Sequence, residues 1–224
     1  MLRAFLGEPS ADTCRTLRHV ICSGEALTFD LQEKFFARFQ CQLHNLYGPT
    51  EAAVDVTHWT CVRESRSPVV PIGRPVANTQ MHVLDDRLNP VPVGREGELF
   101  IGGVQVGLGY HNRPELTAEK FLPDPFSARP GARLYRTGDL ARWLPDGTLD
   151  YLGRIDFQVK IRGFRIELGE IESVLAQQPL VRQAVVVARE GVDGEMRLVA
   201  YLSPRENQRA TVGELHAHLI GKLP

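Results

Sequence analysis

The chain has 224 residues, of which 43% are hydrophobic, so it holds enough apolar sequence for one large or two small folded domains. Its 26 Lys and Arg residues against 27 Asp and Glu residues give a formal net charge of -1. No basic run forms a stripe that could follow phosphates, and no apolar run approaches the roughly 18 to 20 residues that cross a bilayer. We therefore expect neither a nucleic-acid partner nor a membrane partner.

Cysteine and histidine spacing gives no sign of a metal centre. The four cysteines are Cys14, Cys22, Cys41 and Cys61, and none of them forms the Cys-x-x-Cys spacing of a zinc site. One residue separates His216 from His218, a spacing that does not place two ligands on one face of a helix. The N-terminus lacks the apolar segment of a secretory signal. We expect reduced thiols and a cytoplasmic protein.

The first third of the chain predicts a β-α-β unit. Leu17–Cys22 and Gln42–Tyr47 have the apolar character of buried strands. Between them, Leu31, Phe35 and Phe39 repeat every four residues, which predicts an amphipathic helix that begins after the capping candidate Thr28.

From position 68 to 153 the pattern changes to short strands separated by Gly and Pro. The predicted strands are Gln80–Leu84, Gly97–Ile101, Leu140–Leu144 and Thr148–Leu152. The run Pro145-Asp146-Gly147 predicts a hairpin turn between the last two strands.

After Arg154 the pattern predicts a second, small α+β domain. Its expected elements are a strand pair around Gly163, a helix with Ile171, Val174 and Leu175 on one face, strands Val181–Ala188 and Arg197–Leu202, and a helix that begins at the capping box Thr211–Glu214. The predicted domains are therefore residues 1–155 and 156–224.

Three clusters carry possible chemistry. Asn45–Glu51 combines an aromatic ring, a Gly-Pro turn, a hydroxyl and a carboxylate, which could contact a base, a phosphate and Mg²⁺, although a plain strand-to-loop turn fits the same spacing. Tyr135–Asp139 places a carboxylate after a glycine, at an expected strand start, where it could accept ribose hydroxyls or belong to an ordinary turn. Gly153–Gly163 carries four charged residues at the predicted domain border, as a hinge or as a solvated edge strand.

The order of these clusters resembles the adenylate-forming superfamily, and within it the adenylation domains of nonribosomal peptide synthetases. Further matching runs are Gly97–Gly103 continuing to Gly109-Tyr110, Arg113–Thr117, Trp143–Gly147 and Arg162–Glu167. The resemblance implies the C-terminal part of the large adenylate-forming domain, made of a β-α-β unit and a distorted β-barrel-like subdomain, followed by a small, truncated α+β domain. The run Val106–Gly109 departs from the family, in which many members have an Ala-Arg pair, and we assign it no role.

The resemblance also implies an activity and site residues. Members of the family join an amino acid to AMP from ATP and then transfer it to the phosphopantetheine thiol of a carrier domain. By similarity, Tyr47 stacks on adenine beside Gly48, Thr50 contacts the α-phosphate, Glu51 is the metal ligand for Mg²⁺, and Asp139 binds the ribose. Arg154 supports ribose and phosphate.

Three residues match the mobile part of the family. Asp156 corresponds to the hinge about which the small domain rotates, and Gly163 to the loop that approaches the pantetheine. Lys160 corresponds to a lysine of that loop and is a catalytic candidate.

Part of the family's amino-acid pocket falls within the chain. The matching positions are Ile21, Ser23, Leu46, Val54 and Asp55. A small pocket with a hydroxyl and a carboxylate suits a short polar side chain, and this lining resembles that of serine-activating domains. The structural alternative is that Asp55 caps a loop.

The family's phosphate loop, the aspartate that pairs with the substrate amino group and the catalytic lysine have no match in the chain, so we expect negligible adenylation by residues 1–224 alone. Expected partners are a peptidyl carrier domain, a neighbouring condensation domain and a small adenylation-activating protein. Two alternatives stay open: an acyl- or aryl-CoA ligase of the same superfamily, and a non-catalytic binding remnant.

Overall fold

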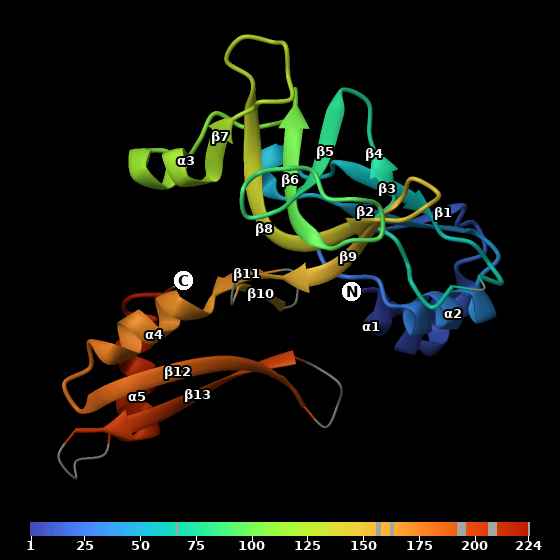
Figure 1. Cartoon of the computed structure of the whole chain (residues 1–224). Helices are drawn as coiled ribbons and strands as arrows, with labels where there is room; N and C mark the ends of the chain where they lie inside the picture. The colour runs from blue at the N-terminus through green and yellow to red at the C-terminus, as the bar shows by residue number, and fades with distance from the viewer. Residues whose placement is uncertain (66, 156–157, 162–163, 192–195, 206–209, 224) are drawn as a thin grey trace. The chain divides into compact units, whose positions relative to one another are not determined.

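The computed structural model describes residues 1–65, 67–155, 158–161, 164–191, 196–205 and 210–223. These residues form two compact units, residues 1–156 and 157–224 (Figure 1). The first unit combines a partly parallel sheet with an antiparallel one, and the second is a small α+β unit. This mixed α/β plus α+β architecture confirms the predicted fold class.

The first sheet of unit 1 contains the predicted β-α-β unit. Strand β1 (His19–Cys22) pairs in parallel with β2 (Gln42–Tyr47), and helix α2 (Phe29–Arg38) connects them. Parallel neighbours need such a crossover. Strands β3 (Thr57–Thr60) and β4 (Arg74–Pro75), which the sequence did not indicate, complete the order β1-β2-β3-β4.

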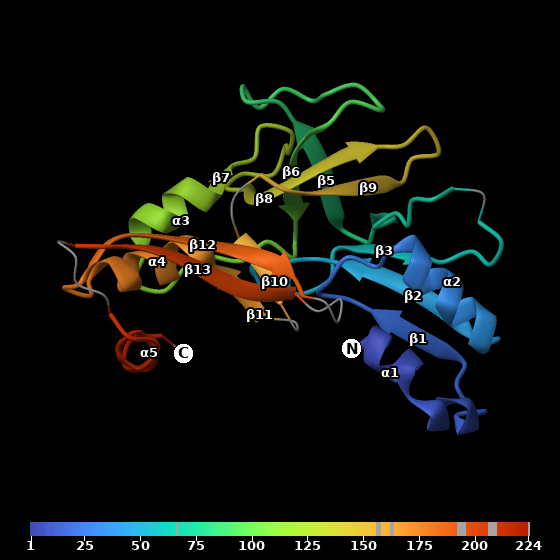
Figure 2. The same ribbon diagram turned by 90° about the horizontal axis from the view of Figure 1, so that it is seen from below.

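Helix α2 begins as predicted, since the Thr28 hydroxyl accepts a hydrogen bond from the backbone N–H of Leu31 at 3.3 Å. Phe35 is fully buried, and Phe39 is buried although it lies one residue beyond the helix. Figure 2 shows α1 (Leu2–Gly7) and α2 beside β1 and β2. Their shared core contains Ala11, Leu27, Phe35, Phe36, Phe39, Leu43 and Cys61.

The second sheet of unit 1 is antiparallel, with the order β5-β6-β8-β7 and β9 paired to β8. Its strands are β5 (Thr79–Leu84), β6 (Gly97–Gly103), β7 (Phe121–Pro123), β8 (Arg133–Trp143) and β9 (Leu149–Arg154), and α3 (Pro114–Lys120) precedes β7. The predicted hairpin turn is present, because Gly147 has a φ of 78° and Asp146 Oδ1 accepts from the backbone N–H of Thr148 at 3.0 Å. The predicted strand Leu140–Leu144 covers only the end of β8, which stops at Trp143.

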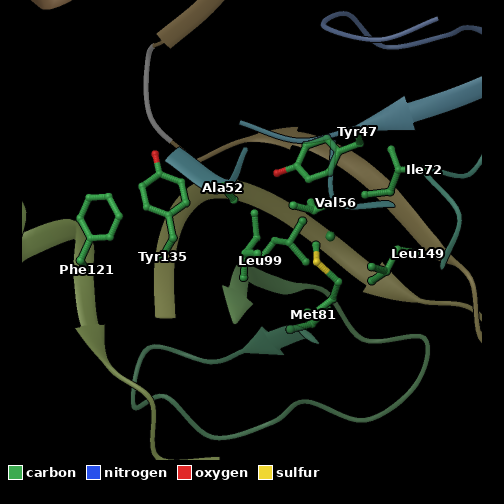
Figure 3. Packing of buried hydrophobic residues seen from close by; sticks show 12 residues of the cluster. Tyr47, Ala52, Val56, Ile72, Met81, Leu99, Phe121, Tyr135 and Leu149 are labelled. Carbon is green, nitrogen blue, oxygen red and sulfur yellow. The ribbon is translucent and has the colours of Figure 1, made fainter. Parts of the chain in front are cut away.

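The main core of unit 1 gathers residues of both sheets (Figure 3). Tyr47 comes from the end of β2, and Phe121 and Tyr135 come from the neighbouring strands β7 and β8, with ring centroids 5.2 Å apart. The other members are Ala52, Val56, Ile72, Met81, Val83, Leu99, Ile101, Ala141 and Leu149. The loop after β2 is therefore anchored in the core through Ala52 and Val56.

The described residues of unit 2 form two antiparallel strand pairs and two helices. Its elements are β10 (Gln158–Ile161), β11 (Phe164–Glu167), α4 (Leu168–Ala176), β12 (Val181–Glu190), β13 (Met196–Pro204) and α5 (Val212–Ile220). The predicted capping box is present, with the Thr211 hydroxyl accepting from the Glu214 N–H and the Glu214 carboxylate accepting from the Thr211 N–H. Leu168, Leu175 and Val186 form its core.

The four cysteines are free thiols. Among the described residues, no helix is both long enough and apolar enough to span a bilayer.

Candidate functional site

The loop that follows β2 carries five predicted site residues, Gly48, Thr50, Glu51, Val54 and Asp55, in a tightly constrained backbone. Thr50 and Glu51 belong to a short 3₁₀ turn, Thr50–Ala52, and Ala53 and Val54 then adopt left-handed φ values of 56° and 77°. A side chain at position 48 would not fit, because a Cβ there would lie 2.2 Å from the carbonyl oxygen of Val54. Gly48 is therefore required by the close return of the loop on itself.

Tyr47, Asp139 and Arg154 form one hydrogen-bonded group, in which Tyr47 and Asp139 are buried and Arg154 is partly buried. The Tyr47 hydroxyl donates to Oδ2 of Asp139, and the Arg154 guanidinium donates to Oδ1 of Asp139 at 3.0 Å. Only 8% of Tyr47 and 6% of Asp139 is exposed. Burial, followed by the nearby Asp139 charge, raises the pKa of Tyr47 well above its ordinary value, so the phenol stays protonated and donates.

Asp139 lies in the interior of β8, and the prediction of a strand start was wrong. The backbone N–H of Asp139 donates to the Thr137 hydroxyl at 2.9 Å, and that hydroxyl donates to the Leu99 carbonyl at 2.6 Å. Gly138 has a φ of 72°, and the pairing register of β8 with β9 shifts between Leu140 and Ala141. This local irregularity explains why an acidic residue can sit within a strand of the core.

Glu51 is held by a tyrosine that the sequence reasoning did not assign. The Tyr110 hydroxyl donates to Glu51 Oε1 at 2.6 Å, and the backbone N–H of Gly107 donates to the Glu51 carbonyl at 2.8 Å. Thr50, its neighbour on the turn, is exposed.

The residues present fit Mg²⁺. Within the residues that the structure describes, no group of three His, Cys, Asp or Glu side chains is arranged to hold a metal ion. Mg²⁺ in nucleotide sites is commonly held by one or two carboxylates together with substrate phosphates and water, so the single, oriented carboxylate of Glu51 has suitable chemistry.

The residues predicted to line the amino-acid pocket include a hydrogen-bonded polar pair and exposed apolar side chains. The Ser23 hydroxyl donates to Asp55 Oδ1 at 2.6 Å, which brings together residues from the end of β1 and from the loop after β2. Ile21 and Val54 are 64% and 61% exposed, and Leu46 is half-buried on β2. The Gln105 amide donates to the Asp55 carbonyl at 3.1 Å and so fixes the loop at this point.

The remaining site predictions concern unit 2 and its border. Lys160 lies in β10, where its Cα pairs with that of Arg165. Asp156 and Gly163 lie outside the described residues.

A row of three histidines crosses the first sheet and was missed by the sequence reasoning. His19 Nδ1 lies 3.1 Å from His44 Nε2, and His44 Nδ1 lies 3.0 Å from His58 Nε2. Adjacent rings stack with centroids 5.3 and 5.2 Å apart. Burial first, and then the charges of His58 and His19, lower the pKa of His44. The sequence could have revealed this row only through the positions of the histidines on neighbouring strands. Such a prediction requires the pairing register of those strands to be known.

One hollow, with a volume of about 380 Å³, lies elsewhere in unit 1. Gln80, Val104, Asp124 and Arg129 are among its lining residues, and none of the predicted site residues lines it.

Comparison with known proteins identifies the family. The protein-family model described as "AMP-binding enzyme" matches residues 1–111. Phosphinothricin tripeptide synthetase PhsB of Streptomyces viridochromogenes is 54% identical over 223 residues, which cover 97% of this chain and 18% of that protein. Tyrocidine synthase 3 of Brevibacillus parabrevis is 44% identical over 224 residues, which cover 100% of this chain and 3% of that protein.

Solved structures that resemble this chain point to the same family. The artificially fused adenylation-PCP di-domain NpsA-ThdA from Klebsiella oxytoca has a TM-score of 0.77 and 32% identity, covering 97% of this chain and 40% of that one. The Vibrio cholerae adenylation domain AlmE, in complex with glycyl-adenosine-5'-phosphate, has a TM-score of 0.82 and 30% identity, covering 96% of this chain and 40% of that one. IdnL1 has a TM-score of 0.87 and 29% identity, covering 99% of this chain and 46% of that one.

The chain therefore belongs to the AMP-binding enzymes, in the branch of the nonribosomal peptide synthetase adenylation domains. The resemblance drawn from its motifs is confirmed. The chain spans less than half the length of each of these relatives.

Proposed function

We propose that this chain supplies nucleotide-binding residues, and part of the amino-acid pocket, of an enzyme that activates an amino acid for nonribosomal peptide synthesis. In this reaction a carboxylate oxygen of the amino acid attacks the α-phosphorus of ATP, and the bond to pyrophosphate breaks. The phosphopantetheine thiol of a carrier domain then attacks the acyl carbon, the thioester bond forms, and AMP leaves. The sequence relatives include a tripeptide synthetase, and AlmE is described with an aminoacyl adenylate, which supports this reaction class.

The observation that carries the proposal is the placement of Asp139. Asp139 is buried, and its carboxylate accepts hydrogen bonds from the Arg154 guanidinium and from the Tyr47 hydroxyl. A carboxylate in this position can accept hydrogen bonds from the two hydroxyls of a ribose. The aromatic ring beside it can stack on the adenine. Arg154 supports the same carboxylate and adds positive charge near the phosphates.

The turn after β2 supplies the phosphate end of the site. Thr50 is exposed, and its hydroxyl is proposed to donate to an α-phosphate oxygen. Glu51, which accepts a hydrogen bond from Tyr110, is the proposed ligand for Mg²⁺. Held by Glu51, Mg²⁺ would neutralise negative charge on the phosphates. Gly48 keeps the turn closed against Val54 and so holds both side chains on one short segment.

The substrate is serine in this proposal. Ser23 and Asp55 are hydrogen-bonded to each other beside the exposed, apolar side chains of Ile21 and Val54, and Leu46 lies on the neighbouring strand. A hydroxyl–carboxylate pair suits a substrate side chain that carries a hydroxyl. A substrate without a hydroxyl would leave a polar group of the protein without a partner and would therefore bind less well.

Unit 2 is proposed to serve the transfer step. By family similarity, Asp156 acts as the hinge and Gly163 approaches the pantetheine. Lys160, which lies in strand β10 and not on a loop, is proposed as a catalytic residue. The carrier domain is the partner that donates the thiol, and the adenylation-PCP di-domain among the structural relatives supports this pairing. A condensation domain and a small activating protein are further proposed partners, and the cytoplasm is the proposed location.

The test is amino-acid-dependent exchange of pyrophosphate into ATP by the full-length protein that carries this chain. We expect serine to give the highest exchange rate among the common amino acids. The variant Asp139→Asn should raise the KM for ATP by about tenfold or more, because a charged hydrogen-bond acceptor for the ribose is lost.

Asp150 provides a matched control. Like Asp139, it is a buried aspartate that pairs with an arginine across β8 and β9, with 2.9 Å between its carboxylate and Arg142. Asp150→Asn should lower stability while leaving the KM for ATP within about twofold of the unchanged protein. Equal KM values for the two variants would contradict the role of Asp139, and ATP-dependent loading of free coenzyme A in place of a carrier would favour an acyl-CoA ligase.

A further inference from the structure

One segment, residues 105–110, holds the loop after β2 at three points. The Tyr110 hydroxyl donates to Glu51 Oε1 at 2.6 Å, the Gly107 N–H donates to the Glu51 carbonyl at 2.8 Å, and the Gln105 amide donates to the Asp55 carbonyl at 3.1 Å. Two of these contacts converge on Glu51, one on its side chain and one on its backbone.

Tyr110 is itself fixed in place. Its ring packs edge-on against Phe121, with centroids 5.4 Å apart. Its backbone N–H donates to the Thr117 hydroxyl at 2.9 Å, and Thr117 belongs to helix α3. The ring is therefore held by packing and the backbone by a hydrogen bond, both at points other than the phenol oxygen.

The Glu51 carboxylate gains its orientation from this contact. Glutamate has three rotatable side-chain bonds, and Glu51 lies on a three-residue 3₁₀ turn that is followed by two left-handed residues. A hydrogen bond from a fixed hydroxyl to Oε1 favours one orientation of the carboxylate over the others. Metal-binding carboxylates are commonly held in this way by a hydrogen-bond donor that does not touch the metal.

We infer that Tyr110 is a positioning residue, which orients the Glu51 carboxylate for Mg²⁺ through its hydroxyl. This inference rests on the proposed function, in which Glu51 is the Mg²⁺ ligand. It adds a residue far from the loop in sequence and separates two tasks: Glu51 binds, and Tyr110 orients.

The test measures binding of Mn²⁺, as a paramagnetic substitute for Mg²⁺, to the full-length protein saturated with a non-hydrolysable ATP analogue. In Tyr110→Phe the ring stays against Phe121 and only the hydroxyl is lost. The dissociation constant for Mn²⁺, measured by electron paramagnetic resonance, should rise about tenfold or more. The Mg²⁺ concentration needed for half-maximal pyrophosphate exchange should rise with it, while the KM for the amino acid stays unchanged.

Two controls separate orientation from a general structural effect. Tyr201→Phe removes a tyrosine hydroxyl from an exposed position of β13 and should bind Mn²⁺ like the unchanged protein. In a Glu51→Gln background, the further change Tyr110→Phe should add less than about a twofold effect, because two residues that act through one contact are not additive.

The outcomes are distinguishable. Unchanged Mn²⁺ affinity in Tyr110→Phe, or a full additional loss in the Glu51→Gln background, overturns the positioning role and leaves the proposed function intact. Absence of nucleotide-dependent Mn²⁺ binding in the unchanged protein overturns the proposed metal site itself, and the positioning role with it.

Discussion

The Tyr47 hydroxyl donates a hydrogen bond to the Asp139 carboxylate, and so joins two positions that are 92 residues apart. Tyr47 ends β2 of the first sheet, and Asp139 lies within β8 of the second. The residue proposed for the base and the residue proposed for the ribose are therefore held together by the protein before a nucleotide enters. Arg154 completes the group from β9.

The first prediction concerns the energy of this contact. Tyr47→Phe keeps the aromatic ring and removes the donor, which leaves a buried charged oxygen with one hydrogen bond fewer. We expect the free energy of unfolding of unit 1 to fall by about 1.5–3 kcal/mol. Urea unfolding followed by tryptophan fluorescence measures this, since both tryptophans, Trp59 and Trp143, belong to unit 1. An unchanged urea midpoint would show that the contact contributes no net stability.

The second prediction concerns the closed turn at Gly48. Gly48→Ala would place a Cβ 2.2 Å from a backbone oxygen, and backbone cannot move aside as a flexible side chain can. We expect a loss of about 3 kcal/mol or more and a loss of ATP binding, because the Thr50–Glu51 turn must shift. Gly7→Ala is the matched control: it lies in helix α1 with nothing within 4 Å of the added Cβ, so helix propensity makes it neutral or stabilising. Similar losses in both variants would refute the steric argument.

A third prediction tests the amino-acid pocket. Asp55→Ala removes the acceptor of the Ser23 hydroxyl and should lower the preference for serine over alanine, measured as a ratio of kcat/KM values in pyrophosphate exchange, by about tenfold or more. The control is Asp86→Ala, an exposed aspartate of the loop after β5, which should leave the ratio unchanged. If Asp55→Ala retains the original ratio, the carboxylate does not recognise the substrate hydroxyl.

The histidine row gives a pH-dependence prediction. Because the pKa of His44 is lower in the folded protein, the unfolded chain takes up a proton at a higher pH than the folded protein does. Stability should therefore fall as the pH drops below about 6.5, the ordinary histidine value. His44→Gln should flatten this fall, as urea midpoints at several pH values between about 7.5 and 5.5 would reveal.

Another histidine supplies the comparison for that experiment. His111→Gln changes an exposed histidine of a loop in the same unit and should retain the slope of the unchanged protein. Equal slopes for His44→Gln and the unchanged protein would mean that the stacked row does not resist protonation.

The elements that the sequence predicted well are those with a strong local signal. Helix α2 has an apolar repeat and a capping threonine, and α5 has a complete capping box. The Asp146-Gly147 turn was equally clear, because the left-handed φ of Gly147 is a local requirement. The first half of β8 was missed for the opposite reason: its buried residues do not alternate, and Gly138 interrupts it.

Motifs identified site residues but not what supports them. Glu51 was found from its place after Gly-Pro-Thr, whereas Tyr110, which holds it, lies 59 positions away. No periodicity links two such positions, since the contact depends on how the sheets pack. The Ser23–Asp55 pair was assigned to one pocket by family resemblance alone, and its hydrogen bond appears only in the structure.

The left-handed backbone of Val54 has a consequence for how substrate preference can evolve. A β-branched residue with a φ of 77° is strained by about 1–3 kcal/mol, and glycine or asparagine would relieve much of that strain. Position 54 is also a proposed contact of the amino-acid side chain. Every substitution at position 54 therefore alters substrate selectivity and folding energy together. A substitution that changes the preferred amino acid is tolerated best when it also relieves the strain of the loop.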